Sequence, residues 1–166
     1  MSDKPAPKPL FTAADIEGGR DVIFRHPWNP KSEVHTKHLA HWAGLRRIAL
    51  TLARVPPGKE SFVYHSHERD EEFLFVLSGR GRAEIDGKTF EVGPGDFMGF
   101  TAPGVAHHLT NPYDEDLVYL MGGERSTLDI GHFPKLGRHI IFGPSGIYAA
   151  DDASLRPMKN EDWLGE

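Results

Sequence analysis

The residues in this sequence whose types and spacing could hold a metal ion begin with His65 and His67, which are separated by one residue. Side chains on a β-strand point alternately to its two faces, so both imidazoles would lie on the same face. Glu72 follows shortly after and can supply a carboxylate oxygen, and the distant His107 can supply a third nitrogen. Three neutral nitrogens and one carboxylate suit Zn²⁺, Fe²⁺, Ni²⁺ or Mn²⁺. We therefore expect one divalent metal ion per chain.

The composition argues against several classes of function. The chain of 166 residues fits one domain, and its net charge of −5 argues against nucleic acid or an anionic membrane as a partner. Apolar runs are too short for a transmembrane helix, and residues 1–9 lack the apolar core of a signal peptide. The sequence has no cysteine, which excludes disulfides and thiolate ligands. We expect a cytoplasmic protein.

Glycine and proline residues divide most of the chain into short segments, as is typical of strands joined by tight turns. Asp86-Gly87 is a typical two-residue hairpin turn. Residues 10–45 show no steady period, and residues 35–42 could form a short helix or a long loop. Strands are expected over residues 45–55, 61–67, 71–78, 82–85, 89–92, 97–101, 107–110 and 117–122. About eight short antiparallel strands indicate a closed barrel or a jelly roll.

The strand expected over residues 71–78 is apolar on both of its faces. Leu74 and Val76 share the face of Glu72, whereas Phe73 and Phe75 lie on the opposite face. A strand that is apolar on both faces must be covered on both. Either the terminal segments or a second subunit covers the outer face, and we favour a homodimer.

Two groups of residues in this chain resemble the two sequence motifs of the cupin superfamily. The first group consists of Gly58, His65, His67, Glu72 and Gly79. The second group consists of Gly95-Asp96, Pro103-Gly104, His107 and Asn111. The resemblance covers about residues 44–123. The flanks, including residues 137–144, are similar to those of small single-domain bacterial cupins with a conserved barrel of the cupin 2 type.

The resemblance implies an all-β fold, namely a double-stranded β-helix (the cupin or jelly-roll barrel) with short helical or irregular terminal segments. The barrel would span residues 44–123, between an N-terminal extension over residues 1–43 that packs on it and a C-terminal extension over residues 124–166. The resemblance also implies that the barrel holds one divalent metal ion. The implied ligands are His65, His67, Glu72 and His107.

Two of these four positions have a neighbour of the same type. His107 is followed by His108, and only one of the two can face the interior of a regular strand. The spacing to Asn111 favours His107, which leaves His108 facing outward. Glu71 could replace Glu72, but only Glu72 keeps the spacing of the first motif.

The residue that would transfer protons is less well defined. Tyr64, Tyr119 and His139 are candidate proton donors or acceptors. Arg47 would share a face with Ala49 on a regular strand, and its guanidinium could bind a substrate carboxylate or phosphate through two hydrogen bonds. The alternative is that Arg47 is a solvated residue at the start of its strand.

Three further histidines, His35, His38 and His41, recur at intervals of three residues. On a helical turn they could imitate a second metal site, but no nearby carboxylate or cysteine completes one. They could instead be surface histidines, or they could cover the mouth of the barrel.

The cupin superfamily includes dioxygenases, isomerases, epimerases, decarboxylases, lyases and sugar-binding modules, so the fold leaves the reaction open. One hypothesis is a metalloenzyme of the isomerase or lyase type, acting without redox change on a sugar acid or a hydroxy/keto acid. A second is an Fe²⁺-dependent dioxygenase. A third is a non-catalytic module that binds or senses a sugar. In each case the partner is a small molecule.

Overall fold

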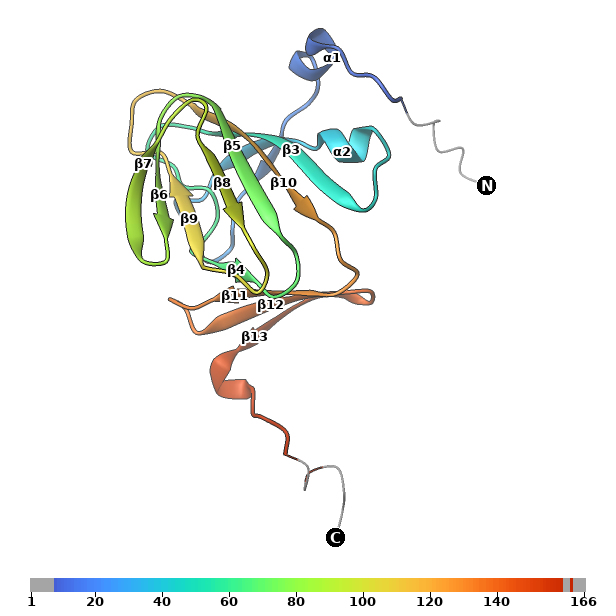
Figure 1. Ribbon diagram of the computed structural model, residues 1–166, viewed down its shortest axis with the longest axis vertical. Coiled ribbons are helices and arrows are strands. Elements are labelled where there is room, and N and C mark those ends of the chain that lie inside the picture. The colour runs from blue at the N-terminus through green and yellow to red at the C-terminus, as the bar shows by residue number, and fades with distance from the viewer. Residues whose placement is uncertain (1–7, 160–161, 163–166) are drawn as a thin grey trace.

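Short β-strands make up most of the regular secondary structure in a computed structural model that describes residues 8–159 and Asp162 (Figure 1). The helical elements are α1 (Ala13–Glu17), α2 (Leu39–Trp42) and the 3-10 turn η1 (Asp152–Ser154). The strands up to the middle of the chain are β1 (Val22–Phe24), β2 (Val34–Lys37), β3 (Ile48–Val55), β4 (Ser66–His67), β5 (Glu72–Ser78) and β6 (Gly81–Ile85). Those that follow are β7 (Lys88–Val92), β8 (Phe97–Phe100), β9 (His107–Thr110), β10 (Leu117–Glu124), β11 (Asp129–Phe133), β12 (Arg138–Gly143) and β13 (Gly146–Asp151).

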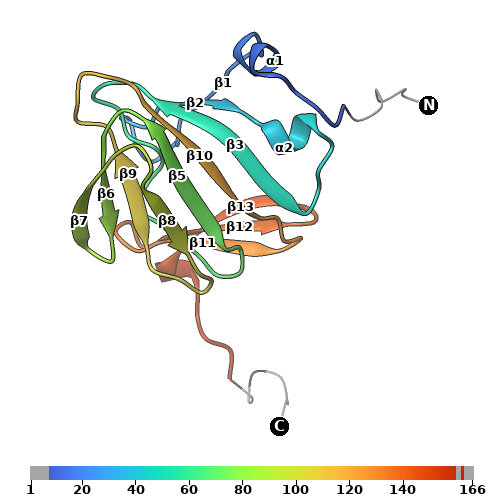
Figure 2. The ribbon, with the colours of Figure 1, turned by 45° about the horizontal axis from the view of Figure 1, so that its top comes forward.

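The strands form three antiparallel sheets (Figure 2). A six-stranded sheet has the order β1-β2-β3-β10-β5-β8, and a three-stranded sheet has the order β7-β6-β9. A third sheet, of order β13-β12-β11-β4, lies at one end of the barrel, below the other strands in Figure 1. The expected all-β jelly-roll fold is confirmed. No helix in the described part of the chain is long and apolar enough to cross a membrane.

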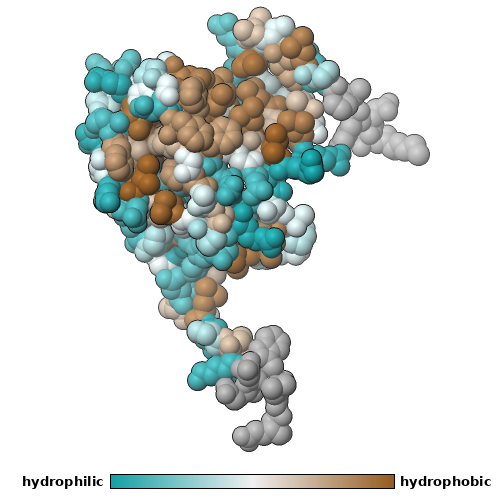
Figure 3. Space-filling view, in the orientation of Figure 1, coloured by the Kyte–Doolittle hydropathy of each residue, from teal (hydrophilic) through white to brown (hydrophobic). Residues whose placement is uncertain are grey.

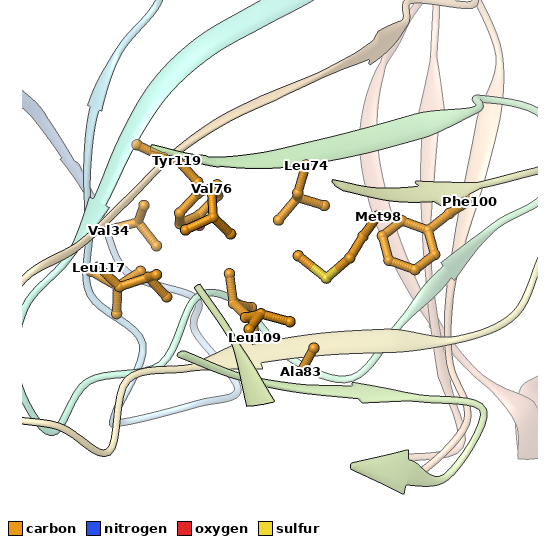
Figure 4. Close-up of a cluster of buried hydrophobic side chains, with 12 residues drawn as sticks. Val34, Leu74, Val76, Ala83, Met98, Phe100, Leu109, Leu117 and Tyr119 are labelled. Atoms are coloured by element: carbon orange, nitrogen blue, oxygen red, sulfur yellow. The ribbon is translucent and has the colours of Figure 1, made fainter. Parts of the chain in front are cut away.

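The core lies between the six-stranded and three-stranded sheets, which supply most of its side chains (Figure 4). On β5, Leu74 and Val76 point inward as expected, and on β10 Leu117 and Tyr119 do the same. Leu109 of β9 meets them from the opposite sheet. Burial of each large apolar side chain contributes roughly 1.5–3 kcal/mol, so this cluster holds the two walls of the barrel in register.

The hairpin expected at Asp86-Gly87 is present between β6 and β7. Both residues have positive φ angles, 50° for Asp86 and 70° for Gly87. Two successive positive φ values are the geometry of a type I′ turn, whose twist matches that of the paired strands. The sequence signal was reliable here because Asp-Gly tolerates this conformation.

The segment over residues 61–67 differs from the continuous strand that we expected, because only Ser66–His67 forms a ladder strand. Upstream of it, the Ser61 hydroxyl oxygen accepts a hydrogen bond from the backbone N–H of Leu109 at 3.3 Å. His65 pairs with His107 through an isolated bridge. This segment therefore pairs with β9 at separated points and not along a continuous ladder.

Strands in both flanks were not expected from the sequence. In β11 the buried positions are Asp129, Gly131 and Phe133, so the period-two apolar signal is absent. β2 pairs with β3, and β11 pairs with β4, so the sheets continue across residues 43/44 and 123/124. The expected division into an extension, a barrel and a second extension stays a prediction, and residues 1–7 lie outside the described part.

The outward-facing side of the six-stranded sheet carries an apolar surface, which we call the outer sheet face. It includes Ile48 of β3, Phe73 of β5 and Phe97 of β8. Figure 3 shows hydrophobic residues gathered over this region. Phe97 is 65% exposed and Ile48 is 51% exposed, so the described terminal segments leave much of this face uncovered.

Candidate metal centre

Four side chains from separate elements meet inside the barrel. The Nε2 atoms of His65, His67 and His107 lie 3.9, 3.5 and 3.4 Å from Oε2 of Glu72. Two ligand atoms with metal bonds of about 2.0–2.2 Å lie roughly 3.0–3.5 Å apart. Ligand atoms of His65, His67 and Glu72 lie within 4.8 Å of one another, so these three residues could hold an ion. His107 is not part of that compact group, although it contacts the same carboxylate oxygen.

Backbone pairing brings these residues together. His65 and His107 exchange two hydrogen bonds, with N···O distances of 3.0 and 2.7 Å. Glu72 begins β5, opposite Gly123 of β10. His107 is buried and faces Glu72, whereas His108 lies on the other side of β9 with its Nε2 3.7 Å from Glu60.

Hydrogen bonds outside the site fix which nitrogen of His65 and of His67 faces it. Nδ1 of His65 donates to the carbonyl oxygen of Val63 at 2.7 Å, because a carbonyl can only accept. Nδ1 of His67 contacts Oδ2 of Asp129 at 2.5 Å. In a neutral imidazole that donates through Nδ1, Nε2 carries the lone pair that binds metals.

The charges at the site favour a bound cation. Burial, reinforced by the adjacent His107, lowers the pKa of His65 to about 3. Burial by itself would raise the pKa of the Glu72 carboxyl, but contact with His107 and the nearby His67 and His65 lower it to about 2. Near neutral pH, the lone pair of a neutral His65 therefore faces a carboxylate. Such an arrangement of electron-rich atoms is stabilised by a positive ion, so the donor set fits a divalent metal.

A cavity of about 30 Å³ adjoins the site. His65, Glu72, His107 and Tyr119 are among its lining residues. This volume is enough for about one water molecule. His107 also stacks on Phe100, with ring centroids 3.6 Å apart, and its Nδ1 is buried without a hydrogen-bond partner among the described residues.

Tyr119 is the catalytic candidate that the structure places at this cavity. The side chain is fully buried, and its hydroxyl has no hydrogen-bond partner among the described residues. Burial, with the nearby charge of Glu72, raises the pKa of the Tyr119 hydroxyl. The phenol therefore stays protonated and can donate a hydrogen bond.

The other two proton-transfer candidates lie elsewhere. The Tyr64 hydroxyl accepts a hydrogen bond from the backbone N–H of Gly87 at 3.1 Å, in the β6–β7 turn. His139 lies on β12, where its Nδ1 is 2.9 Å from that of His132 and its Nε2 is 2.5 Å from Asp152. Neither residue lines the cavity at Glu72.

Arg47 is exposed and precedes β3, which begins at Ile48 rather than at residue 45 as we expected. Its carbonyl oxygen accepts a hydrogen bond from the backbone N–H of Arg125 at 3.0 Å. Because Arg47 lies outside the strand, the alternation that would turn its side chain into the lumen does not apply. Substrate binding by Arg47 stays a prediction.

Of the three histidines at positions 35, 38 and 41, His35 lies apart, whereas His38 and His41 line one pocket. His35 contacts Glu33 and Arg54, and His38 contacts the hydroxyl of Thr51 at 3.2 Å. A second, more open pocket of about 350 Å³ is lined by residues that include His38, His41, Thr51 and Arg125. Thr51 of this pocket pairs across the sheet with Met121, which lines the smaller cavity.

Asp129 is a site residue that the sequence analysis missed. It begins β11, is 2% exposed, and lies 62 positions from the histidine that it contacts. Burial alone would raise the pKa of its carboxyl, but the hydrogen bond with His67 and that from the backbone N–H of Arg69 lower it. A single aspartate outside both motifs carries no spacing signal, so it could not be singled out.

Comparisons with known proteins agree with this fold. The family model described as Cupin domain matches residues 51–123. A crystal structure of a protein from Acidithiobacillus ferrooxidans, provisionally named a sugar phosphate isomerase, is 32% identical with a TM-score of 0.88, over 92% of this chain and 98% of that chain. The chain belongs to the cupin superfamily. This cupin also resembles a crystal structure from Silicibacter pomeroyi, called a sugar phosphate isomerase from a cupin superfamily, with 21% identity and a TM-score of 0.78 over 92% of this chain and 98% of that chain.

A further relative is an uncharacterized protein from Methanocaldococcus jannaschii. It is 35% identical to this cupin over 63 residues, which are 38% of this chain and 49% of that protein. The match therefore spans about half the length of that relative.

Proposed function

We propose that this cupin binds one divalent metal ion through His65, His67, Glu72 and His107 and uses it, without redox change, on a small oxygenated substrate. The reaction class is isomerisation or lyase chemistry on a sugar acid or a hydroxy/keto acid. The observation that carries the proposal is the approach of three imidazole Nε2 atoms to within 3.4–3.9 Å of one oxygen of Glu72.

The residues around the site have separable roles in this proposal. A bound divalent ion would polarise a carbonyl or hydroxyl oxygen of the substrate. Tyr119 would donate a proton to an oxygen atom held in the cavity, because its protonated hydroxyl lacks another partner. Phe62 and Leu109, which also line the cavity, would exclude bulk water.

The neighbouring pocket supports an anionic substrate. It collects His38, His41 and Arg125, and its Thr51 pairs with Met121 of the smaller cavity. The smaller cavity of about 30 Å³ admits the reacting oxygen atoms but not a whole sugar. In this proposal the rest of the substrate extends toward Arg125, which would bind its carboxylate or phosphate. The relative from Acidithiobacillus ferrooxidans, provisionally named a sugar phosphate isomerase, supports the same reaction class.

One observation favours a second candidate, a module that binds a small molecule without turning it over. Among the residues that line the cavity, Tyr119 and Ser61 are the polar ones outside the metal set. An enediolate mechanism needs a base as well as an acid, and a second strong candidate is not among these lining residues. The Fe²⁺-dependent dioxygenase uses the same four ligands and differs in its requirement for oxygen.

The test reloads chelator-stripped protein with Zn²⁺, Ni²⁺, Mn²⁺ or Fe²⁺ and follows sugar phosphates, sugar acids and hydroxy acids by NMR, with and without oxygen. Turnover that needs metal and is unchanged without oxygen supports the isomerase or lyase. Oxygen uptake that stops under anaerobic conditions would indicate the dioxygenase. Saturable binding without turnover under any metal would indicate the binding module.

The metal ligands themselves are tested by elemental analysis. The double variant His65→Ala/His107→Ala should lose stoichiometric divalent metal, because two of four ligands are gone. His108→Ala is the matched control, since that imidazole lies on the outer side of β9 near Glu60 and should leave the metal content unchanged. Full metal content in the double variant would refute the ligand assignment.

We also infer that the protein is a homodimer. The support is the outer sheet face, where Phe97 is 65% exposed on an otherwise regular sheet. Exposed apolar patches of this kind commonly mark protein interfaces. Light scattering should give about twice the 18.5 kDa of one chain, and a monomer at all concentrations would contradict the inference. The cytoplasmic location stays a prediction.

A further inference from the structure

We propose that Asp129 is a positioning residue of the candidate metal centre, and that its carboxylate holds His67 in the tautomer that presents Nε2 to the metal. This inference rests on the metal binding proposed above. Asp129 lies outside residues 51–123, the segment that the Cupin domain model matches. The inference therefore gives the C-terminal part of the chain a role at the metal centre.

The contact between the two side chains is close and well shielded from water. Oδ2 of Asp129 lies 2.5 Å from Nδ1 of His67, and the side chains are 3% and 16% exposed. The other carboxylate oxygen, Oδ1, accepts hydrogen bonds from the backbone N–H groups of Arg69 at 2.9 Å and Asp70 at 3.4 Å. An ionised carboxylate can only accept hydrogen bonds, so the hydrogen shared between Asp129 and His67 belongs on the imidazole.

The consequence for the imidazole follows from its chemistry. A neutral histidine carries one N–H, so a hydrogen fixed at Nδ1 leaves a lone pair at Nε2. Nε2 of His67 is the atom that lies 3.5 Å from Glu72. Metal-binding histidines usually donate their other N–H to a carboxylate or carbonyl, and loss of that partner typically reduces metal affinity about 10- to 100-fold.

A second contact ties the same strand to another ligand. Phe133, at the far end of β11, stacks on His65 with ring centroids 5.8 Å apart and an interplanar angle of 19°. β11 also pairs directly with β4, where Gly131 lies opposite His67. Two of the proposed ligands are therefore oriented by one strand. Metal affinity and the docking of β11 should be coupled, and such coupling acts in both directions.

Asp129 also binds the backbone of the loop between β4 and β5. A test must therefore separate a purely structural role of Asp129 from a role in positioning His67. Asp129→Asn makes this separation. Its amide oxygen can still accept the hydrogen bond from Arg69, while its NH₂ group would face Nδ1 of His67. An amide that donates to Nδ1 favours the Nε2–H tautomer, in which the nitrogen facing Glu72 cannot bind a metal.

Asp70→Asn is the matched control. Oδ1 of Asp70 accepts a hydrogen bond from the backbone N–H of Ser126 at 3.0 Å, so it too ties this loop to a neighbouring segment. It has no described contact with a proposed metal ligand. The exchange preserves its acceptor oxygen, and the effect on metal binding should be below about threefold.

The experiment titrates full-length, chelator-stripped protein with Co²⁺, following its visible absorption and the heat of binding. Asp129→Asn should raise the Kd for Co²⁺ roughly 10- to 100-fold, with the unfolding transition of the metal-free protein little changed. An unchanged Kd in Asp129→Asn would overturn this inference while leaving the metal site itself in place. A wild-type protein that takes up no Co²⁺ would overturn the proposed function and this inference together.

A second measurement needs no variant. Long-range ¹H–¹⁵N NMR of the metal-free protein distinguishes the two tautomers of His67. The Nδ1–H form is expected, and a predominant Nε2–H form would overturn the inference even if Asp129→Asn failed to fold.

Discussion

Replacing Tyr119 with phenylalanine separates the stability of this protein from its activity. The Tyr119 hydroxyl is fully buried and has no hydrogen-bond partner among the described residues. An unsatisfied buried polar group costs about 1–3 kcal/mol of folding free energy. Tyr119→Phe removes that group and keeps the ring, so the free energy of unfolding should rise by up to about 1–3 kcal/mol. For a chain of this size, each kcal/mol corresponds to roughly 2–4 °C in Tm.

The same substitution should remove the proposed proton donor. Loss of a general acid typically lowers kcat by about 10²- to 10⁴-fold. Metal-free protein is compared by urea unfolding and calorimetry, and metal-loaded protein by steady-state kinetics with the substrate found in the screen. A loss of more than about 1 kcal/mol in stability would refute the reasoning, because it would show that the hydroxyl has a partner in the folded state. Unchanged kcat would remove Tyr119 from the mechanism.

Tyr64→Phe is the control for both readouts. The Tyr64 hydroxyl accepts a hydrogen bond from the backbone N–H of Gly87 and does not line the cavity. Its loss should cost about 0.5–1.5 kcal/mol and leave kcat unchanged. The two phenylalanine variants should therefore move stability in opposite directions.

Three further perturbations test other parts of the structure. The pKa of His65 falls from 6.5 to about 3 on folding, so the imidazole stays neutral in the folded state while the unfolded chain takes up a proton. The free energy of unfolding of the metal-free protein should consequently decrease as pH falls from 6.5 toward 3, by about 1.4 kcal/mol per pH unit from this group. His65→Gln should reduce that pH dependence in urea unfolding. Phe97→Glu, on the outer sheet face, should weaken the proposed dimer roughly 10- to 100-fold in sedimentation experiments, whereas a wild-type Kd would place the interface elsewhere. Arg125→Ala should raise KM for an anionic substrate about 10- to 100-fold with little change in kcat, and a purely kcat effect would exclude a role in binding its charged group.

The barrel strands could be predicted from the sequence where an apolar period-two pattern coincided with turn residues. β5 and β9 match their expected ranges closely, and the type I′ hairpin follows from Asp86-Gly87. The inward positions of β5 were also readable, because Leu74 and Val76 alternate with residues of the outer face. In these strands the local sequence pattern was sufficient, because the polarity of each residue indicates whether its position is buried.

The flanking strands and the outer layer of the candidate site could not be predicted in this way. β11 turns Asp129 and Gly131 inward, so its buried face is not apolar and no alternation is visible. The side-chain contact between Asp129 and His67 depends on the pairing of β11 with β4, which is a long-range property. Arg47 shows the opposite error: alternation was extended beyond Ile48, where the strand begins, to a residue that is exposed.

The pairing of β4 with β11 has a consequence for protein engineering. A chimera that exchanged only residues 51–123 between two relatives would transfer all four proposed ligands. It would leave behind Asp129, which contacts His67, and Phe133, which stacks on His65. β4 of one relative would then have to pair with β11 of the other, although the two strands did not evolve together. Grafts intended to change specificity should therefore carry β11 along with the barrel.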